Sequence, residues 1–342
     1  MTVRTSAAIR PRRAAAILAA AALTLATAGC GGSDDDASAS GGTSADGQTT
    51  IRVVTAVSNS YWFLPIQQAE ALGTFEGTGL DVQVIDGTTP TLGQILASGD
   101  ADVALGGGTT EAALREQGIE QTIVGSNYAP WGMHVVANDN TDAQSIEDLE
   151  GANFGITGAG APSDYSVHKI AQELGWTTSD YQTTSFGDVA SMVAGFRSGA
   201  VDAIIWGADT AFSLEDEGSG RILGSSADYV GPTVLEAFSV MDEFGQENSG
   251  ALRTFFEAYY AEVAELQADP QQFIDTLVQQ SGYSQSVAEK LAEEELPLMS
   301  ADGKITSEQL TGLSEGAAFS TGDRTNENPI EAEYSYWADT YK

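Results

Sequence analysis

Strand-type and helix-type segments alternate along this chain, and the alternation limits its fold more than any other feature. Ile51–Val54 is a short apolar run typical of a strand, and Tyr61–Leu72 is typical of a helix that carries Pro65 in its first turns. Leu80–Val84 alternates strictly between apolar and polar residues, as half-buried strands do. Thr91–Ser98 again has apolar residues at helical spacing. Strands that alternate with helices predict βα units, largely parallel sheets and an α/β fold.

The alternating pattern also repeats. The segment Ser98–Ala104 (SGDADVA) recurs as Ser198–Ile204 (SGAVDAI), one hundred residues later. The residues that follow, Gly106–Thr110 and Trp206–Thr210, align at the same offset. From Asn248 onward the pattern becomes helical. We therefore predict two similar α/β lobes, with a ligand cleft where the carboxyl ends of their strands face each other. Closure of the lobes around the ligand is the expected motion.

The N-terminus indicates export. Four arginines precede the apolar stretch Ala14–Ala28, which is too short to span a bilayer and fits a secretory signal peptide. The stretch ends just before Cys30, so we predict a lipoprotein signal at residues 1–29 with Cys30 as the lipidated residue. Residues 30–49 are small and polar and predict a flexible tether. We expect an extracytoplasmic protein held on the outer face of the cell membrane by this lipid.

Composition argues against nucleic-acid binding and most catalysis. The 342 residues include 14 Lys and Arg against 49 Asp and Glu, a formal net charge of −35, whereas phosphate backbones require Lys and Arg. Cys30 is the only cysteine, so the core has no cysteine nucleophile and no intramolecular disulfide.

The remaining candidate catalytic or metal-binding residues have structural interpretations. His134 and His168 lack a carboxylate at metal-ligand spacing. We expect His134 to be structural and His168 to lie on a hydrophilic helix face. Glu293–Glu295 is expected to be a solvated helix face. We expect no enzyme activity, no metal and no cofactor. A lipid-tethered adhesin is a weaker alternative, because adhesins are usually rich in β-repeats.

Four stretches resemble one known family. They are Ala69–Phe75 running into Gly79–Val82, Ser98–Ala104, Ile146–Gly151 and Ser198–Ala203. In order and spacing they resemble the solute-binding proteins of ABC importers for sulfonates, taurine, nitrate and thiamine-precursor pyrimidines. The resemblance covers about Ile51 to Tyr341. It implies a two-lobed periplasmic-binding-protein fold of type II. The partners that it implies are a small-molecule solute and ABC permease subunits, and we expect a monomer.

The family's fold implies that the chain crosses between the lobes twice. We place the crossings near Trp131–Val136 and Leu235–Met241. The expected first lobe then comprises residues 50–132 and 240–342, and the second lobe residues 133–239.

Loops at the strand ends are predicted to hold the ligand. They offer hydroxyls, glycines that let backbone approach closely, helix N-termini that favour anions, and aromatic faces. The expected ligand-binding residues are Ser58, Asn59, Tyr61, Trp62, Gly107, Thr109, Thr110, Trp131, Ser163, Trp206 and Asp209.

Several of these residues have a structural alternative. Tyr61 and Trp62 could pack within their own lobe, Ser58 could cap a helix, and Trp131 could stiffen the hinge. Asp164 is an awkward neighbour for an anion unless it turns away from the ligand. The aromatic residues predict a solute with an aromatic or alkyl body. A small organic anion such as a sulfonate is the first expectation, and a pyrimidine or another heteroaromatic nutrient is the second.

Overall fold

The computed structural model describes residues 48–324 and 330–342. The predicted signal peptide, the lipidation site Cys30 and nearly all of the predicted tether lie outside the described residues. The first strand begins at Thr49, the last residue assigned to the tether. Within the described ranges, no helix combines the length and the apolar character needed to cross a membrane.

The first sheet has five strands in the order β2-β1-β3-β10-β4. They are β1 (Thr49–Thr55), β2 (Leu80–Asp86), β3 (Val103–Gly107), β4 (Gln121–Tyr128) and β10 (Glu236–Met241). β1 pairs in parallel with β2 and β3, whereas β10 runs antiparallel to both β3 and β4. Four strands therefore share one direction, and the strand that comes late in the sequence runs against them.

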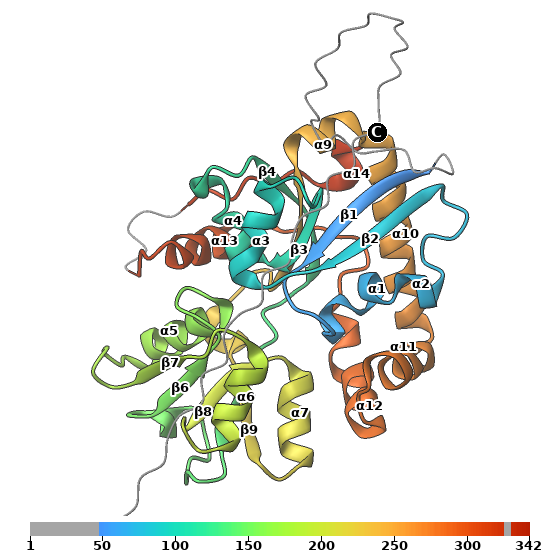
Figure 1. Ribbon diagram of the computed structural model, residues 1–342. Coiled ribbons are helices and arrows are strands. Elements are labelled where there is room, and N and C mark those ends of the chain that lie inside the picture. Colours follow the sequence, from blue (N-terminus) through green and yellow to red (C-terminus); the bar gives the residue numbers. More distant parts are fainter. Residues whose placement is uncertain (1–47, 325–329) are drawn as a thin grey trace, which may run out of the picture. The chain divides into compact units, whose positions relative to one another are not determined.

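The second sheet repeats this plan in the order β7-β6-β8-β5-β9. Its strands are β5 (His134–Asn138), β6 (Asn153–Ile156), β7 (Gln182–Ser185), β8 (Ala203–Trp206) and β9 (Gly220–Ser225). Here β5 is the antiparallel strand, between β8 and β9. We call the parts of the fold built on the two sheets the first and the second lobe (Figure 1). The predicted α/β fold with two mixed, largely parallel sheets is confirmed.

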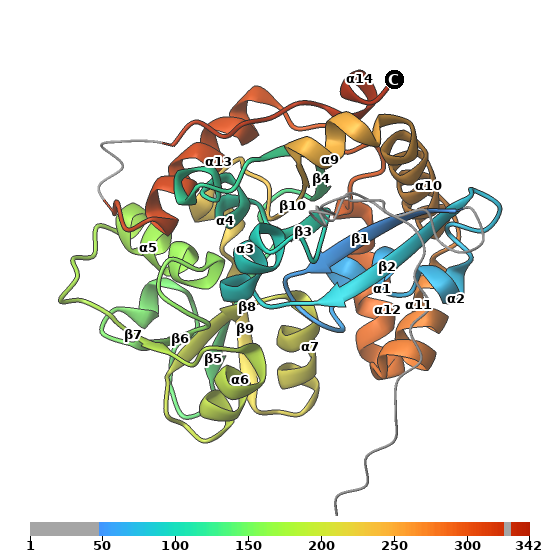
Figure 2. The same cartoon turned by 45° about the horizontal axis from the view of Figure 1, so that its top comes forward.

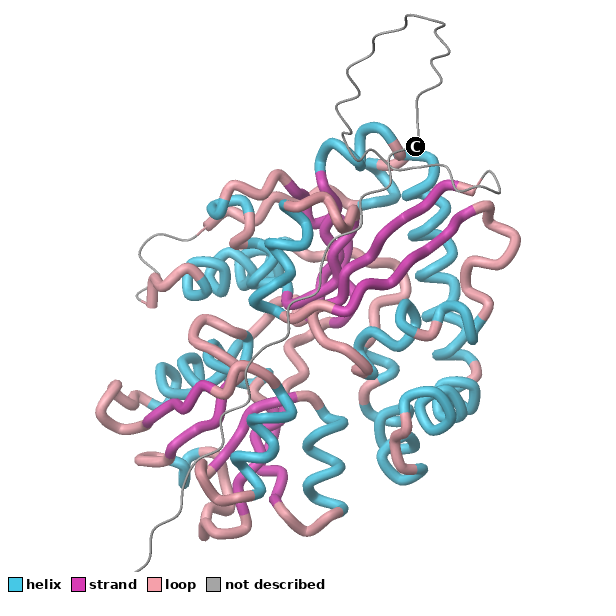
Figure 3. The backbone as a smooth tube through the Cα atoms, in the orientation of Figure 1, coloured by secondary structure: helices cyan, strands magenta, loops and turns pink. Residues whose placement is uncertain are grey.

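Helices surround both sheets (Figure 3). They are α1 (Leu64–Gln67), α2 (Ala69–Leu72), α3 (Thr89–Ala97), α4 (Gly108–Ala112), α5 (Pro162–Leu174), α6 (Val189–Arg197), α7 (Ala208–Asp216), α8 (Ala227–Val230), α9 (Asp242–Glu247), α10 (Ser249–Ala268), α11 (Pro270–Thr276), α12 (Gln285–Glu294), α13 (Ser307–Ser320) and α14 (Trp337–Thr340). Short turns of helix include η1 (Tyr61–Phe63), η2 (Arg115–Gln117), η3 (Glu147–Leu149), η4 (Leu277–Ser281) and η5 (Leu296–Leu298).

The first sheet is covered on both faces. On one face, Phe238 of β10 packs edge-on against Phe255, Phe256 and Tyr259, which form the apolar stripe of α10. The opposite face is occupied by α3 and α4, since a Cβ atom on Gly106 would lie 2.9 Å from Leu92 of α3. Side chains alternate along a strand, so Gly106 and its neighbour Leu105 lie on opposite faces of the sheet, and Leu105 shares its face with Phe238. Figure 2 shows α4 and α13 side by side, to the left of β10.

The hundred-residue repeat corresponds to the same arrangement of helix end and hydrogen-bonded aspartate in each lobe. In each copy a glycine with positive φ ends a helix, Gly99 at 75° after α3 and Gly199 at 74° after α6. The aspartate three residues later then binds the neighbouring strand. Asp102 Oδ2 accepts from the backbone N–H of Arg52 at 2.9 Å, and Asp202 Oδ2 accepts from that of Asn153 at 2.8 Å. The repeat therefore has a structural cause in both lobes.

The two aspartates differ in their side-chain partner, which yields a stability prediction. Asp102 also accepts from the Arg52 guanidinium, at 2.9 Å to Nε and 2.5 Å to Nη2. We expect Asp102→Ala to lower the free energy of unfolding by about 3 kcal/mol. The substitution removes the carboxylate partner of the half-buried Arg52 guanidinium and the acceptor of the Arg52 backbone N–H group. Asp202→Ala should cost about 1–2 kcal/mol, since only the N–H group loses its partner. Urea unfolding at pH 7 measures both, and equal losses would show that Arg52 contributes nothing.

The chain crosses between the lobes twice. It leaves the first sheet after Tyr128, enters the second at His134, and returns between Ser225 and Glu236. The predicted second crossing, Leu235–Met241, was therefore placed too late. Its apolar run is the buried strand β10, and residues 226–235 make the connection instead.

Candidate ligand-binding site

Strands of both lobes end at the starts of helices. β3 runs directly into α4, and β8 reaches α7 through Gly207 alone. The five residues 157–161 join β6 to α5. In open α/β sheets these carboxyl ends of the strands are the usual ligand position.

A cavity of about 820 Å³ lies against these loops and is lined from both lobes. Its lining residues come from the loop after β1 (56–58), the start and body of α3 (87–97), α4 and the turns after it (110–119), the loop before α5 (157–161), the loop before α6 (187–190), and Trp206 and Ser320. This volume is typical of sites for whole organic molecules.

The cavity lining is largely uncharged. Asp188 is the only charged residue among the described residues that line it. Its carboxylate caps α6, since Oδ1 accepts from the backbone N–H of Ser191 at 2.8 Å and Oδ2 from the Ser191 hydroxyl at 2.8 Å. These hydrogen bonds, the backbone one above all, hold the pKa of Asp188 below its usual value. In the described part of the chain, no cluster of three or more His, Cys, Asp or Glu is placed to hold a metal ion.

Three of the predicted ligand-binding residues line this cavity, namely Ser58, Thr110 and Trp206. Thr110 stands out because its hydroxyl oxygen is buried and has no hydrogen-bond partner. A fourth, Gly107, ends β3 of the first lobe and faces the second lobe, because a Cβ atom there would be 3.1 Å from Cγ of Pro162 in α5. The first lobe thus approaches the start of α5 closely, with the Thr110 hydroxyl nearby.

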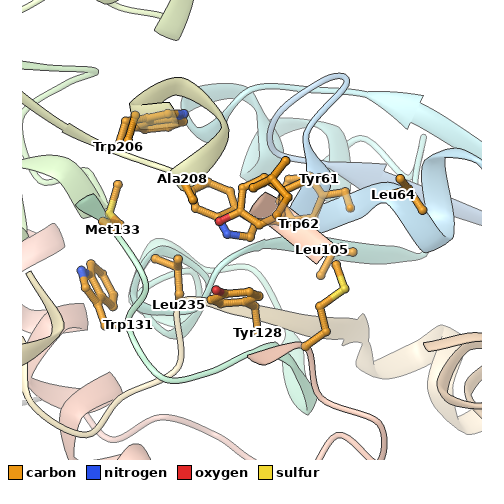
Figure 4. Close-up of a cluster of buried hydrophobic side chains, with 14 of the residues drawn as sticks. Tyr61, Trp62, Leu64, Leu105, Tyr128, Trp131, Met133, Trp206, Ala208 and Leu235 are labelled. Carbon is orange, nitrogen blue, oxygen red and sulfur yellow. The ribbon is translucent and has the colours of Figure 1, made fainter. Parts of the chain in front are cut away.

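Three predicted aromatic residues do not line the cavity. Tyr61, Trp62 and Trp131 are at most 1 % exposed and belong to the hydrophobic core (Figure 4). The ring of Trp62 lies 5.9 Å from that of Trp206, and Trp131 Nε1 donates to Ser166 Oγ at 2.8 Å. Among the described residues that line the cavity, Trp206 is the one aromatic residue, and the ring of Trp62 packs beside it in the core.

The four remaining predicted residues also lie outside the lining. Asn59 is exposed and donates to the carbonyl of Ser281 at 3.0 Å. Thr109 is buried against Gly316 of α13. Ser163 Oγ accepts from the backbone N–H of Thr157 at 3.1 Å, and Asp209 accepts from the Tyr283 hydroxyl at 2.8 Å. Asn59, Ser163 and Asp209 thus have local hydrogen-bond partners, whereas the Thr109 hydroxyl is buried without one.

Asp164, which seemed awkward beside an anion, turns away from the cavity. Its Oδ2 atom accepts from the backbone N–H of Gly160 at 2.9 Å and pairs with Arg324 at 2.6 Å. Ser320 Oγ also donates to the carbonyl of Gly160, at 3.0 Å. Because Ser320 ends α13 of the first lobe, these bonds tie the two lobes together beside the cavity, and the Asp164 carboxylate in the first turn of α5 is paired with Arg324.

One of the acidic residues expected to be solvated is buried. Glu295 is 3 % exposed, whereas Glu293 and Glu294 are exposed. Glu295 Oε2 accepts from the hydroxyls of Tyr61, at 3.0 Å, and Tyr128, and Oε1 lies 3.1 Å from His134 Nε2. Burial raises the pKa of both tyrosines, so their hydroxyls stay protonated and donate. His134 begins the second sheet, and the carboxylate therefore joins both lobes near the first crossing.

His168 also differs from its expected position on a hydrophilic face. Its ring lies 4.9 Å from that of Phe319, and burial lowers the pKa of the imidazole. The side chain is thus half-buried between α5 and α13.

The predicted ligand-binding residues do not include the segments at the starts of α3 and α6. Gly87–Pro90 and Gly187–Ala190 both line the cavity, one from each lobe. They lie one hundred residues apart. Extending the repeat to the segments before Ser98 and Ser198 would have found them.

Comparison with known proteins places this architecture in a family. The NMT1/THI5-like family matches residues 61–273, more than half of the chain. "Putative binding protein YtlA" of Bacillus subtilis is 25% identical over 214 residues, which is 60% of this chain and 63% of YtlA. The match thus spans less than two thirds of that relative.

Solved structures share the fold at low sequence identity. The periplasmic aliphatic sulphonate binding protein SsuA of Escherichia coli superposes with a TM-score of 0.69 at 16% identity, covering 83% of this chain and 90% of SsuA. The alkanesulfonate-binding SsuA of Xanthomonas axonopodis pv. citri, bound to MOPS, gives 0.69 at 16% identity over 84% and 98%. The periplasmic nitrate-binding protein NrtA of Synechocystis PCC 6803 gives 0.57 at 15% identity over 70% and 69%. The resemblance seen in the sequence is confirmed at the level of family and fold, and this chain belongs to the NMT1/THI5-like family.

Proposed function

We propose that this chain is the solute-binding component of an ABC importer and that it performs no catalysis. Cys30 carries the lipid that holds it on the outer face of the cell membrane, and the protein works as a monomer. It captures a small organic molecule by closure of the lobes and delivers it to permease subunits. The observation that carries this proposal is the 820 Å³ cavity, lined from both lobes at the ends of their strands.

The solute that we propose is an organic anion of the sulfonate type. The loop 157–161 lines the cavity just before the start of α5, and its backbone N–H groups can donate to an anionic head without a cationic side chain. Two of the structural neighbours are sulfonate-binding proteins by name, which supports the same class. A thiamine-precursor pyrimidine or another heteroaromatic nutrient is the second candidate, favoured by the aromatic face of Trp206.

A thermal unfolding screen tests both candidates. Residues 31–342 are assayed against sulfonates, nitrate, pyrimidines and amino acids. A solute at one hundred times its Kd should stabilise the protein by about 2.7 kcal/mol, a clear rise in melting temperature. Stabilisation by one class, with the solute recovered unchanged, supports the proposal. Consumption of the solute would favour an enzyme instead, and the absence of any shift across the panel would contradict solute binding.

Trp206→Ala should weaken binding of the solute identified by this screen. Burial of an aromatic ring against a ligand contributes more than about 1.4 kcal/mol, so we expect a loss of more than about tenfold in affinity. Isothermal titration calorimetry measures the loss. Trp176→Ala is the matched control, because Trp176 is half-buried but does not line the cavity. Unchanged affinity in a folded Trp206→Ala protein would remove Trp206 from the site.

A further inference from the structure

The cavity extends beyond the strand ends into a groove on the first lobe. One wall is α3, with Gly93 and Ala97, and the other is the segment from α4 to η2. The two walls approach each other closely at Gly93, where a Cβ atom would lie 2.9 Å from Leu114 and 3.0 Å from Ile119. Leu114 and Ile119 are themselves buried and form an apolar floor.

The groove has no charged side chain among its described lining residues. Thr110 lies in α4, Leu114 in the turn that follows α4, and Gln117 at the end of η2. Gln94 and Gln117 are polar, whereas Gly93, Ala97, Ala113, Leu114 and Ile119 are not. The cavity thus has the strand-end loops at one end and an uncharged, mainly apolar channel at the other.

The second lobe has a much smaller hollow at the corresponding position. One hundred residues after Ala97 and Gln117 stand Arg197 and Glu217. These two form a bidentate ion pair, with Nη2 to Oε1 at 2.8 Å and Nε to Oε2 at 3.1 Å. The hollow beside Arg197 measures only about 180 Å³ and is separate from the large cavity. The first lobe has Ala and Gln in place of that ion pair, and its groove is open.

We propose that the open groove binds the alkyl or aryl tail of an amphiphilic solute whose polar head lies at the loop 157–161, which precedes α5. This inference rests on the proposed function and specifies its solute. Backbone donors of that loop hold the head, and the tail displaces water along Leu114 and Ile119. The solute is therefore larger and more apolar than nitrate or taurine.

A homologous series tests the tail site. Binding of n-alkane-1-sulfonates from methane- to octanesulfonate is measured by calorimetry on residues 31–342, which include every described residue. Each buried methylene should improve affinity about fourfold until the groove is filled. A parallel series of 2-alkyl-4-aminopyrimidines carries the same chains on the second candidate head.

Matched double variants locate the effect. Ala97→Arg with Gln117→Glu copies the ion pair of the second lobe, and we expect it to abolish the gain with chain length. Arg197→Ala with Glu217→Gln makes the reciprocal change in the second lobe and should leave the gain intact. Circular dichroism and the melting temperature confirm that both variants fold.

The outcomes separate the two proposals. Binding that is independent of chain length, or a gain that persists in the Ala97→Arg, Gln117→Glu protein, would overturn the tail site while the importer role stands. If neither series binds at any length, both the tail site and the proposed solute class are overturned.

Discussion

Gly158→Trp is expected to lower solute affinity by about 10- to 100-fold or more while leaving the fold intact. Gly158 lines the cavity, and a Cβ atom there would meet nothing within 4 Å. The indole can therefore grow into the space that the solute occupies without disturbing protein atoms. Packing extra atoms into an occupied site costs roughly 1–3 kcal/mol, which sets the size of the loss. Calorimetry with the solute from the thermal screen measures it.

The control is a glycine in an equally open position elsewhere. Gly250 in α10 is exposed, has no atom within 4 Å of a built Cβ, and does not line the cavity, so Gly250→Trp should bind normally. Ala190→Trp fills the cavity from α6 and provides a second, independent block. If Gly158→Trp and Ala190→Trp both keep the affinity of the natural protein, the solute binds elsewhere.

The fold could be predicted from the sequence because its signals are local and repeated. Alternating strands and helices require a covered parallel sheet, and the motif at Ser98 and Ser198 marks the same helix end and strand start in each lobe. Asp102 and Asp202 recur because each binds the backbone of a neighbouring strand. The antiparallel insertion of β10 could not be read from these signals. Its pairing joins residues more than one hundred positions apart, and its apolar run resembles any other buried segment.

The candidate site was predicted only in part because side-chain direction is not a local property. Ser58, Thr110 and Trp206 follow strands and line the cavity. Trp62 also follows a strand, but its helix turns the indole toward Trp206 and the lobe junction. The side chain of an aromatic residue after a strand can therefore line the cavity or pack into the core, and the packing of the other lobe determines which. Glu295 illustrates the same limit, since only the tertiary fold brings Tyr61, Tyr128 and His134 to one carboxylate.

Glu295→Ala is expected to lower the free energy of unfolding by about 3–5 kcal/mol. The substitution leaves the hydroxyls of Tyr61 and Tyr128 buried without an acceptor, and each buried unpaired group costs about 1–3 kcal/mol. It also removes the partner of His134 and thus a bond between the two lobes. Urea unfolding at pH 7, followed by tryptophan fluorescence, measures the loss.

The neighbouring glutamate supplies the control. Glu294 is adjacent in sequence and exposed, so Glu294→Ala should change stability by less than about 0.5 kcal/mol. Glu295→Gln keeps the shape and one acceptor oxygen, and we expect it to fall between the other two variants, because an amide can still accept from one tyrosine. A Glu295→Ala protein as stable as Glu294→Ala would mean that the desolvation cost of the buried carboxylate cancels its hydrogen bonds. The cluster would then fix the relative position of the lobes without stabilising the fold.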